Sequence, residues 1–237
     1  MRKIVALLLY IVSFLGFSCS FESEGIFTDD STEEYQLYDY YIDSYGNEGV
    51  VAYIHNSKNT GRKYVIVISS DESYHSWGPM GENVYKSDTI SKLGINQPSF
   101  GVAMHQAMKS IGIKRFPAQA WCDEKNSNEK YPRAGSWRLP SCQELQLVFG
   151  TKGEKVDVLN ASLTGIGASP INKNNVYWTC VEDFEGYITI KGEQSDYDKE
   201  NRAVIYSPLN STFSYKDRWL KKNKYYVRAI KYVYYQY

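Results

Sequence analysis

The sequence predicts an α+β fold in which short helices pack on a mostly antiparallel, twisted sheet. A hairpin pattern comes first, at 49–69, helical patterns occupy the middle of the chain, and strand patterns gather in its last third. Because the helices precede the late strands instead of alternating with them, this order favours α+β over a parallel α/β sheet.

The first 18 residues have the pattern of a secretory signal. Two basic residues precede an apolar run at 4–17, which is shorter than the roughly 20 residues of a membrane-spanning helix. Cys19 follows, and the junction resembles the lipobox of Bacteroidota-type lipoproteins, with Gly16 where Leu is usual. We expect residues 1–18 to be a lipoprotein signal peptide and Cys19 to carry the lipid. The protein would then lie at the outer membrane, facing the cell exterior; an ordinary signal peptide with an incidental Cys is the alternative.

Residues 19–34 form an acidic segment, in which positions 20–34 carry six carboxylates and no basic side chain. Such a run repels itself and has little apolar surface to bury, so it predicts a flexible tether. The remaining residues, 35–237, are enough for one domain with its own core.

The charge balance gives no reason to expect a nucleic acid as partner. The chain has 27 Lys and Arg and 27 Asp and Glu, so loss of the two basic residues of the signal leaves a net charge near −2. Such a chain has no strong field to attract nucleic acid or an anionic surface, and we expect membrane contact through the lipid anchor only. Its 22 Tyr suit both strands and binding faces.

The elements before residue 130 can be predicted from local patterns. Two runs rich in β-branched residues, 49–55 and 63–69, flank a polar turn and predict a β-hairpin. The turn-rich stretch 71–85 predicts a loop. Helical spacing predicts a helix over 99–111, and a Pro at a favoured first position opens a second one over 117–125.

A sharp corner follows in the stretch "GSWRLPSCQEL". Pro140 disfavours helical backbone at Leu139, so the chain arrives extended. Ser141 fits an N-cap, and Glu144 three residues later completes a capping box for a helix that Gly150 ends. Beyond it we expect one helix and four strands, at 156–164, 176–180, 187–190, 203–206 and 225–233.

Four motifs in this order, "AQAWC", "WRLPSCQEL", "VYWTCVED" and "KYYVRAIK", resemble the C-terminal domain of collagen-like bacterial adhesins and the related paralogous domains of surface lipoproteins. The early hairpin and its Trp-Gly also match. The resemblance implies a C-type lectin-like domain over residues 35–237. That superfold includes binding modules and a few enzymes, so the fold alone does not assign a function.

We expect the corner of this pattern, formed by Trp137, Arg138, Pro140, Ser141 and Glu144, to be structural. Trp137 would fill the core at the end of a strand. Arg138 would brace the turn through carbonyls or a carboxylate, using its planar fork of donors. The alternative is that Trp137 and Arg138 line a ligand site.

The cysteines are interpreted by comparison with the same family. Cys142 and Cys180 stand where relatives have small or polar residues, and two such departures in a secreted chain predict a Cys142–Cys180 disulfide that stabilises by about 2–4 kcal/mol. In relatives the Cys at position 122 often pairs with one in the closing strand, where this chain has Ala229. We therefore expect Cys122 to be a buried free thiol; the two other pairings stay open.

The sequence predicts no enzyme and no cofactor. The oxygenase-like members of the superfold use either an iron-binding His cluster or a pair of Cys near the C-terminus. This chain has neither pattern, because its histidines, His55, His75 and His105, lack the spacing of an iron site and no second Cys follows Cys180.

Calcium, through which many C-type lectins hold sugars, is the remaining cofactor candidate. Asp196, Asp198 and Glu200 alternate as calcium ligands can. However, Asn201 and Ser207 replace the Gly and Glu of an EF-hand loop, so we expect a solvated polar loop and no metal.

A ligand site is expected around the insertion between residues 181 and 202. Tyr187, Tyr197 and Trp219 could form a stacking platform for a sugar ring, and Asp196 and Asp198 could accept hydrogen bonds from its hydroxyls. The alternative is that Tyr187 and Trp219 are core residues.

These observations predict a non-catalytic, adhesin-like binding module at the cell surface that recognises a glycan or a matrix ligand. The alternative is a structural subunit that docks on other surface proteins. A large exposed apolar patch would favour docking, and an aromatic cleft with convergent carboxylates would favour glycan recognition.

Overall fold

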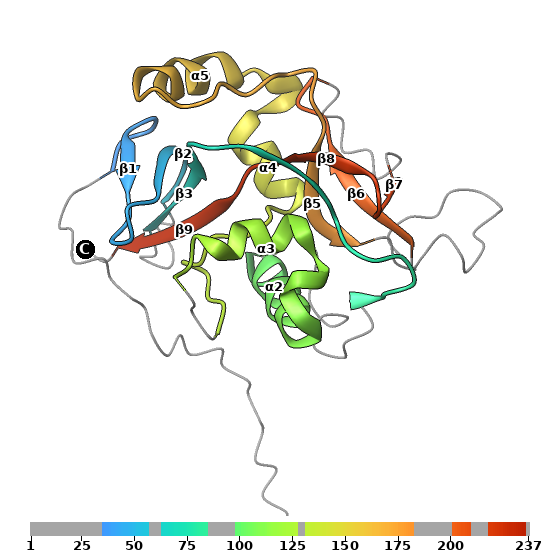
Figure 1. The fold of residues 1–237 in the computed structure, drawn as a ribbon. Coiled ribbons are helices and arrows are strands. Elements are labelled where there is room, and N and C mark those ends of the chain that lie inside the picture. The colour runs from blue at the N-terminus through green and yellow to red at the C-terminus, as the bar shows by residue number, and fades with distance from the viewer. Residues whose placement is uncertain are drawn as a thin grey trace, which may run out of the picture.

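The computed structural model describes residues 35–56, 63–84, 98–127, 131–182, 201–209 and 218–235 (Figure 1). The following predicted features lie outside these residues: the signal peptide 1–18, the tether 19–34, Cys19, Tyr187, Asp196, Tyr197, Asp198 and the strand 187–190. No helix within the described ranges is long and apolar enough to cross a membrane.

The strands of the described residues form two sheets. Sheet A has the order β1-β2-β3-β9 and is antiparallel throughout, with β1 at Tyr40–Ile42, β2 at Glu48–Asn56, β3 at Lys63–Ser69 and β9 at Ile230–Tyr235. Sheet B has the order β4-β8-β5-β6-β7, with β4 at Ser73–Ser76, β8 at Lys224–Val227, β5 at Tyr177–Glu182, β6 at Arg202–Tyr206 and β7 at Arg218–Leu220. Only the β5–β8 pairing is parallel.

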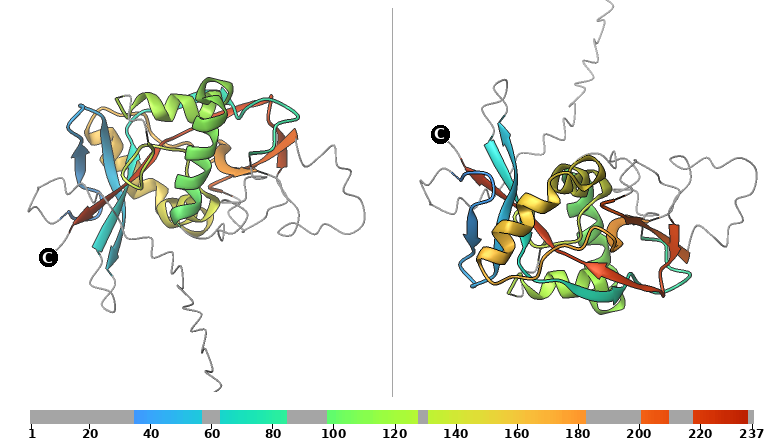
Figure 2. Two further views of the ribbon diagram at one scale, coloured as in Figure 1. Left: turned by 90° about the horizontal axis from the view of Figure 1, so that it is seen from below. Right: turned by 90° about the horizontal axis from the view of Figure 1, so that it is seen from above.

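The helices lie between the hairpin and the late strands in sequence. They are α2 at Pro98–Gly112, α3 at Pro117–Glu124, α4 at Cys142–Phe149 and α5 at Val156–Gly165, with short 3₁₀ turns η2 at Ile113–Arg115 and η3 at Thr151–Gly153. Figure 2 shows β1–β3 at one end of the molecule and β6 and β7 at the other, with α2 and α3 between them.

Sheet A has a hydrophobic core on each of its two faces. Val65 and Val67 of β3 join the core that contains α2, α3 and three buried tryptophans, whereas Ile66 and Ile68 join the core that contains α4 and α5. This explains why β3 reads as an almost continuous apolar run, because a strand covered on both faces does not alternate between apolar and polar residues.

The predicted α+β class is confirmed, but the single sheet is wrong, because the strands divide between two. The strand predicted over 225–233 is in fact β8 and β9, which lie in different sheets. Arg228 separates them: its guanidinium is buried and donates to the carbonyl oxygens of Ser69 at 3.1 Å and Ser169 at 2.8 Å. The predicted loop 71–85 contains a strand, β4.

Candidate functional site

The corner before α4 contains a buried ion pair. The guanidinium of Arg138 donates to both carboxylate oxygens of Glu144, at 2.9 and 2.6 Å, and to the carbonyl oxygen of Leu139 at 3.1 Å. The Tyr232 hydroxyl donates to the same carboxylate at 2.7 Å. Gly101 of α2 lets the guanidinium approach, because a Cβ there would lie 2.4 Å from its Nη1.

The two charges of this pair stabilise each other. Burial by itself would raise the pKa of Glu144, but the charge and hydrogen bonds of Arg138 and the N–H of Ser141 hold it below its usual value. Burial would lower the pKa of Arg138, but Glu144 outweighs that effect and raises it. At neutral pH both groups are therefore charged.

The remaining corner residues position α4 and fill the core. The Ser141 hydroxyl accepts from the N–H of Glu144, and the Glu144 carboxylate accepts from the N–H of Ser141, which completes a capping box. Trp137 is buried, and its indole N–H donates to Asp43 at 2.8 Å. The carbonyl oxygen of Pro140 accepts a hydrogen bond from the N–H of Cys180 at 2.8 Å, so the corner also contacts sheet B.

The predicted disulfide between Cys142 and Cys180 is not formed in the structure, where Cys122, Cys142 and Cys180 are free thiols. The Cys142 thiol contacts the Thr179 hydroxyl at 3.8 Å instead. Burial raises the pKa of Cys142 to about 12 and raises the pKa of Cys122 and Cys180 as well. All three groups are therefore neutral thiols near neutral pH, a form with low reactivity.

His105 belongs to a cluster of ionisable groups between α2 and α3. Its Nε2 lies 2.7 Å from the Asp123 carboxylate, which also accepts from Lys109 at 3.1 Å. Burial lowers the pKa of His105 more than Asp123 raises it. Across the part of the chain that the structure describes, no three His, Cys, Asp or Glu side chains are grouped to hold a metal ion.

Of the predicted ligand residues, the structure describes only the backbone of Trp219, which lies in β7 opposite Ala203. The segment that carries the others begins after Glu182, which is buried and forms an ion pair with Lys221. Lys221 also donates to the carbonyl oxygen of Glu82 and lies 4.8 Å from the centroid of the Trp77 ring. This end of sheet B is thus fixed by a buried, internally paired lysine.

Sequence reasoning did not find an aromatic strip on sheet A, formed by His55, Tyr64 and Tyr234. The three side chains are cross-strand neighbours on β2, β3 and β9, and all are partly exposed. The rings of His55 and Tyr64 stack with centroids 4.5 Å apart, and those of Tyr64 and Tyr234 lie 5.8 Å apart. The alternation of Tyr232 and Tyr234 could have indicated that one face of this strand is aromatic. Only the strand register shows that His55, Tyr64 and Tyr234 are neighbours.

Tyr64, at the centre of the strip, keeps its proton at neutral pH. Burial, followed by the nearby Tyr53, Tyr234 and Glu144, raises the pKa of Tyr64 to about 12. Its hydroxyl can therefore donate as well as accept a hydrogen bond.

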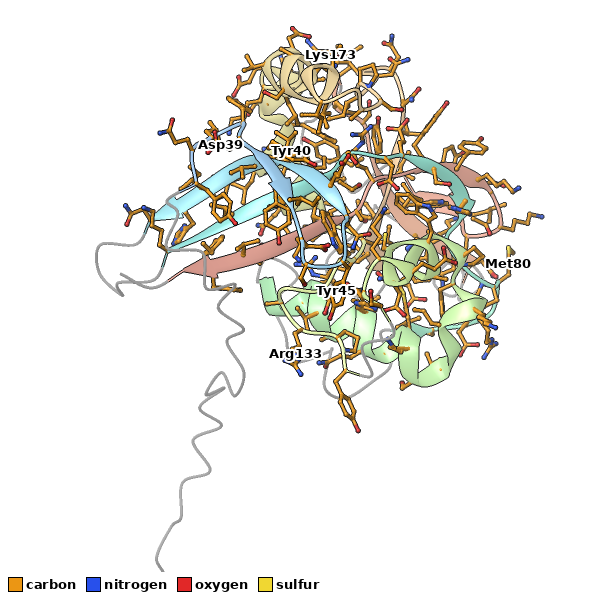
Figure 3. All side chains as sticks on the ribbon, turned by 60° about the vertical axis from the view of Figure 1, so that its left-hand side comes forward. Asp39, Tyr40, Tyr45, Met80, Arg133 and Lys173 are labelled. Atoms are coloured by element: carbon orange, nitrogen blue, oxygen red, sulfur yellow. The ribbon has the colours of Figure 1, made fainter. Side chains whose placement is uncertain are left out.

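A second exposed feature, which we name the β1 edge, consists of Leu37, Tyr40, Ile42 and Tyr45. These side chains are 41, 45, 52 and 59% exposed, and two of them are labelled in Figure 3. The hydrogen bonds of Asp43 to Asn47 and of Val51 to Asp39 set the ladder with β2. The backbone groups of Tyr40 and Ile42 consequently point away from β2, at the outer edge of sheet A.

No protein-family model matches the chain, and no curated protein matches it in sequence. Among solved structures, the chain is similar to a fimbrial protein from Bacteroides ovatus, with 14% identity and a TM-score of 0.54. The match covers 83% of this chain and 48% of that one, so this chain spans about half the length of the fimbrial protein. At this level of identity the likeness concerns the fold.

Proposed function

We propose that this chain is a non-catalytic, adhesin-like binding module that is lipid-anchored at Cys19 and displayed at the cell surface, where it recognises a glycan or a matrix ligand. The observation that carries the proposal is the similarity in fold, over 83% of the chain, to a protein described as fimbrial. The C-type lectin-like architecture and the relation to the collagen-like adhesins are part of the same proposal.

Partly exposed aromatic side chains support the ligand class. Tyr and His rings combine a flat apolar face with a polar tip, and this combination suits ligands that are themselves part apolar and part hydroxylated. The predicted platform of Tyr187, Tyr197 and Trp219, with Asp196 and Asp198 beside it, stays part of the proposal as one location for the site.

A glycan-array screen of the full-length chain, with calcium and again with EDTA, tests the proposal. We expect binding that survives EDTA, because no calcium site is part of the proposal. Binding that EDTA abolishes would instead assign a metal role to Asp196, Asp198 and Glu200. If the chain binds neither an array glycan nor a panel of matrix proteins, the proposal is wrong.

The second candidate function, a docking subunit of a surface assembly, is favoured by the β1 edge. Two of the four exposed side chains there belong to β1 and two flank it, and the outer backbone groups of this strand point away from the sheet. Strand edges of this kind are sites at which another chain can pair. Ile42→Lys should then abolish co-purification with surface proteins and leave the folded chain intact, whereas Val158→Lys, at an exposed position of α5, should not.

A further inference from the structure

The aromatic strip of His55, Tyr64 and Tyr234 is the last row of side chains that the structure describes on one face of sheet A. The row before it consists of Tyr53, Ile66 and Tyr232, and the row before that contains Val50, Ile68 and Ile230. These earlier rows belong to the core under α4 and α5. The strip therefore lies where that core ends, towards the C-terminal end of β9, the strand labelled in Figure 1.

The rings of the strip form a connected surface. Stacking places the His55 and Tyr64 rings at an interplanar angle of 15°. Tyr232 supports the strip from the core side, because its ring centroid lies 5.0 Å from that of Tyr64 and 6.0 Å from that of Tyr234. The Tyr232 hydroxyl is bonded to the buried Glu144, which holds this supporting ring in position.

The chemistry of the strip selects its ligand. Each of the three rings carries a polar atom, a phenol hydroxyl or an imidazole nitrogen, beside an electron-rich face. Among the described side chains on this face, the cations over rings are Lys155, 5.8 Å from Tyr53, and Arg138, 5.4 Å from Tyr232. Both cations are already bonded, to Leu147 and to Glu144 respectively.

An uncharged, hydroxyl-rich ligand fits this surface best. Because the His55 and Tyr64 rings stack on each other, the faces between them are covered, and a ligand meets ring edges, polar tips and the outer faces of the row. The hydroxyls of a sugar can bond to the polar tips, and its C–H groups can pack on the outer faces. A peptide strand would pair with backbone groups at a sheet edge, whereas the strip lies on a sheet face. Adjacent strands are about 4.8 Å apart, a spacing close to the length of one sugar unit.

We propose that the aromatic strip of His55, Tyr64 and Tyr234 is a binding subsite for a neutral oligosaccharide, whose pyranose rings lie across β2, β3 and β9. The inference rests on the proposed function, because it names the ligand class and the position of a site for that same recognition. It differs from the platform predicted around Tyr187, Tyr197 and Trp219.

The test uses the full-length chain and a panel of neutral hexasaccharides of glucose, N-acetylglucosamine, mannose and galactose. We expect at least one of them to bind, and Tyr64→Ala and Tyr234→Ala each to weaken binding by about tenfold. The matched control is Tyr74→Ala. Tyr74 is 51% exposed and packs edge-on against Tyr226 in sheet B, so this variant should bind as the unchanged chain does.

A second measurement does not depend on whether the variants fold. With ¹³C-labelled tyrosine in the unchanged chain, the bound hexasaccharide should shift the ring signals of Tyr64 and Tyr234 and leave that of Tyr74 in place.

The outcomes separate the inference from the proposed function. If a hexasaccharide binds without affecting the signals of Tyr64 and Tyr234, the inference is wrong and the function stands with its site elsewhere. If no neutral hexasaccharide binds but a charged glycan or a matrix protein does, the inference is again wrong and the function stands. Failure to bind any of these ligands overturns both.

Discussion

The carboxylate of Glu144 accepts hydrogen bonds from three groups: the side chain of Arg138, the backbone N–H of Ser141 and the hydroxyl of Tyr232. Its role in the capping box could be predicted from the spacing to Ser141. For Arg138 the sequence left two kinds of partner open, carbonyl oxygens or a carboxylate, and did not single out Glu144. The hydrogen bond from Tyr232, which is 88 residues away, is indicated by no sequence pattern near Glu144. Short-range contacts can be predicted from a sequence pattern, whereas this long-range one depends on the fold.

Replacing Glu144 should strongly destabilise the protein. Glu144→Gln keeps the size of the side chain but leaves the buried guanidinium of Arg138 without its counter-charge, so we expect a loss of about 3–5 kcal/mol of unfolding free energy in urea. The control is Asp157→Asn, which breaks the exposed pair with Lys173 and should cost about 0–1 kcal/mol. Equal losses in the two variants would show that the buried pair is not structural.

The lowered pKa of Glu144 predicts how stability depends on pH. The carboxylate contributes stability that is fully present above its ordinary pKa of 4.5 and is lost as the pH falls through the lower value of the folded state. Urea unfolding at a series of pH values should therefore show the unchanged chain approaching Glu144→Gln in acid. A difference that stays constant from neutral pH to about pH 3 would contradict this.

The cysteines should be free and slow to react. Because Cys122 and Cys180 are buried and their pKa values are raised, iodoacetamide should label them only after denaturation. Peptide mapping without a reducing agent should then find Cys142 alkylated as well. A linked pair of peptides carrying Cys142 and Cys180 would instead restore the disulfide predicted from the sequence.

At the scale of elements, α4 was the helix with the clearest boundary signals. Ser141 and Gly150 mark its two ends, and the structure has the helix at Cys142–Phe149, with Gly150 at a φ of 74°. The split between β8 and β9 had no comparable signal. In the sequence Arg228 fits the pattern of one long strand. In the structure its side chain instead donates to the carbonyl oxygens of Ser69 and Ser169, between the two strands.

Removing the cap of α4 should have a measurable but smaller effect than breaking the ion pair. Ser141→Ala loses the hydroxyl that accepts from the N–H of Glu144, and we expect a cost of about 1 kcal/mol in urea unfolding. Thr164→Ala, at an exposed position near the end of α5, should stay within about 0.5 kcal/mol of the unchanged chain. If the two variants are equally stable, the capping box does not stabilise α4.

At the scale of the whole molecule, sheet A combines the first strands of the domain with its last one. β9 pairs with β3, and the two sheets are joined by the short link between β8 and β9. The aromatic strip is a product of this closure, since His55 and Tyr64 meet Tyr234 only when the C-terminal strand is in place. Loss of β9 would therefore remove its pairing with β3 and one of the three rings of the proposed subsite.

The proposed lipid anchor at Cys19 predicts where the protein lies in the cell. In cells that carry the full-length chain, Cys19→Ala should move the protein from the membrane pellet to the soluble fraction, because acyl chains supply about 0.8 kcal/mol for each buried CH₂. The control is Cys122→Ala, at a buried position, which should stay with the membranes. A Cys19→Ala protein that still pellets with membranes would exclude the lipid anchor.

The α+β class, the hairpin of β2 and β3 and the capped helix α4 can all be predicted from the amino-acid sequence, because they depend on the spacing of residues close together in the chain. The sequence also suggested that the chain carries binding aromatics. Three features become visible only in the folded molecule: the strands form two sheets, Cys142 contacts Thr179, and His55, Tyr64 and Tyr234 share one face of sheet A. These features depend on strand register and long-range packing, which are set by contacts throughout the core and leave no local pattern in the sequence.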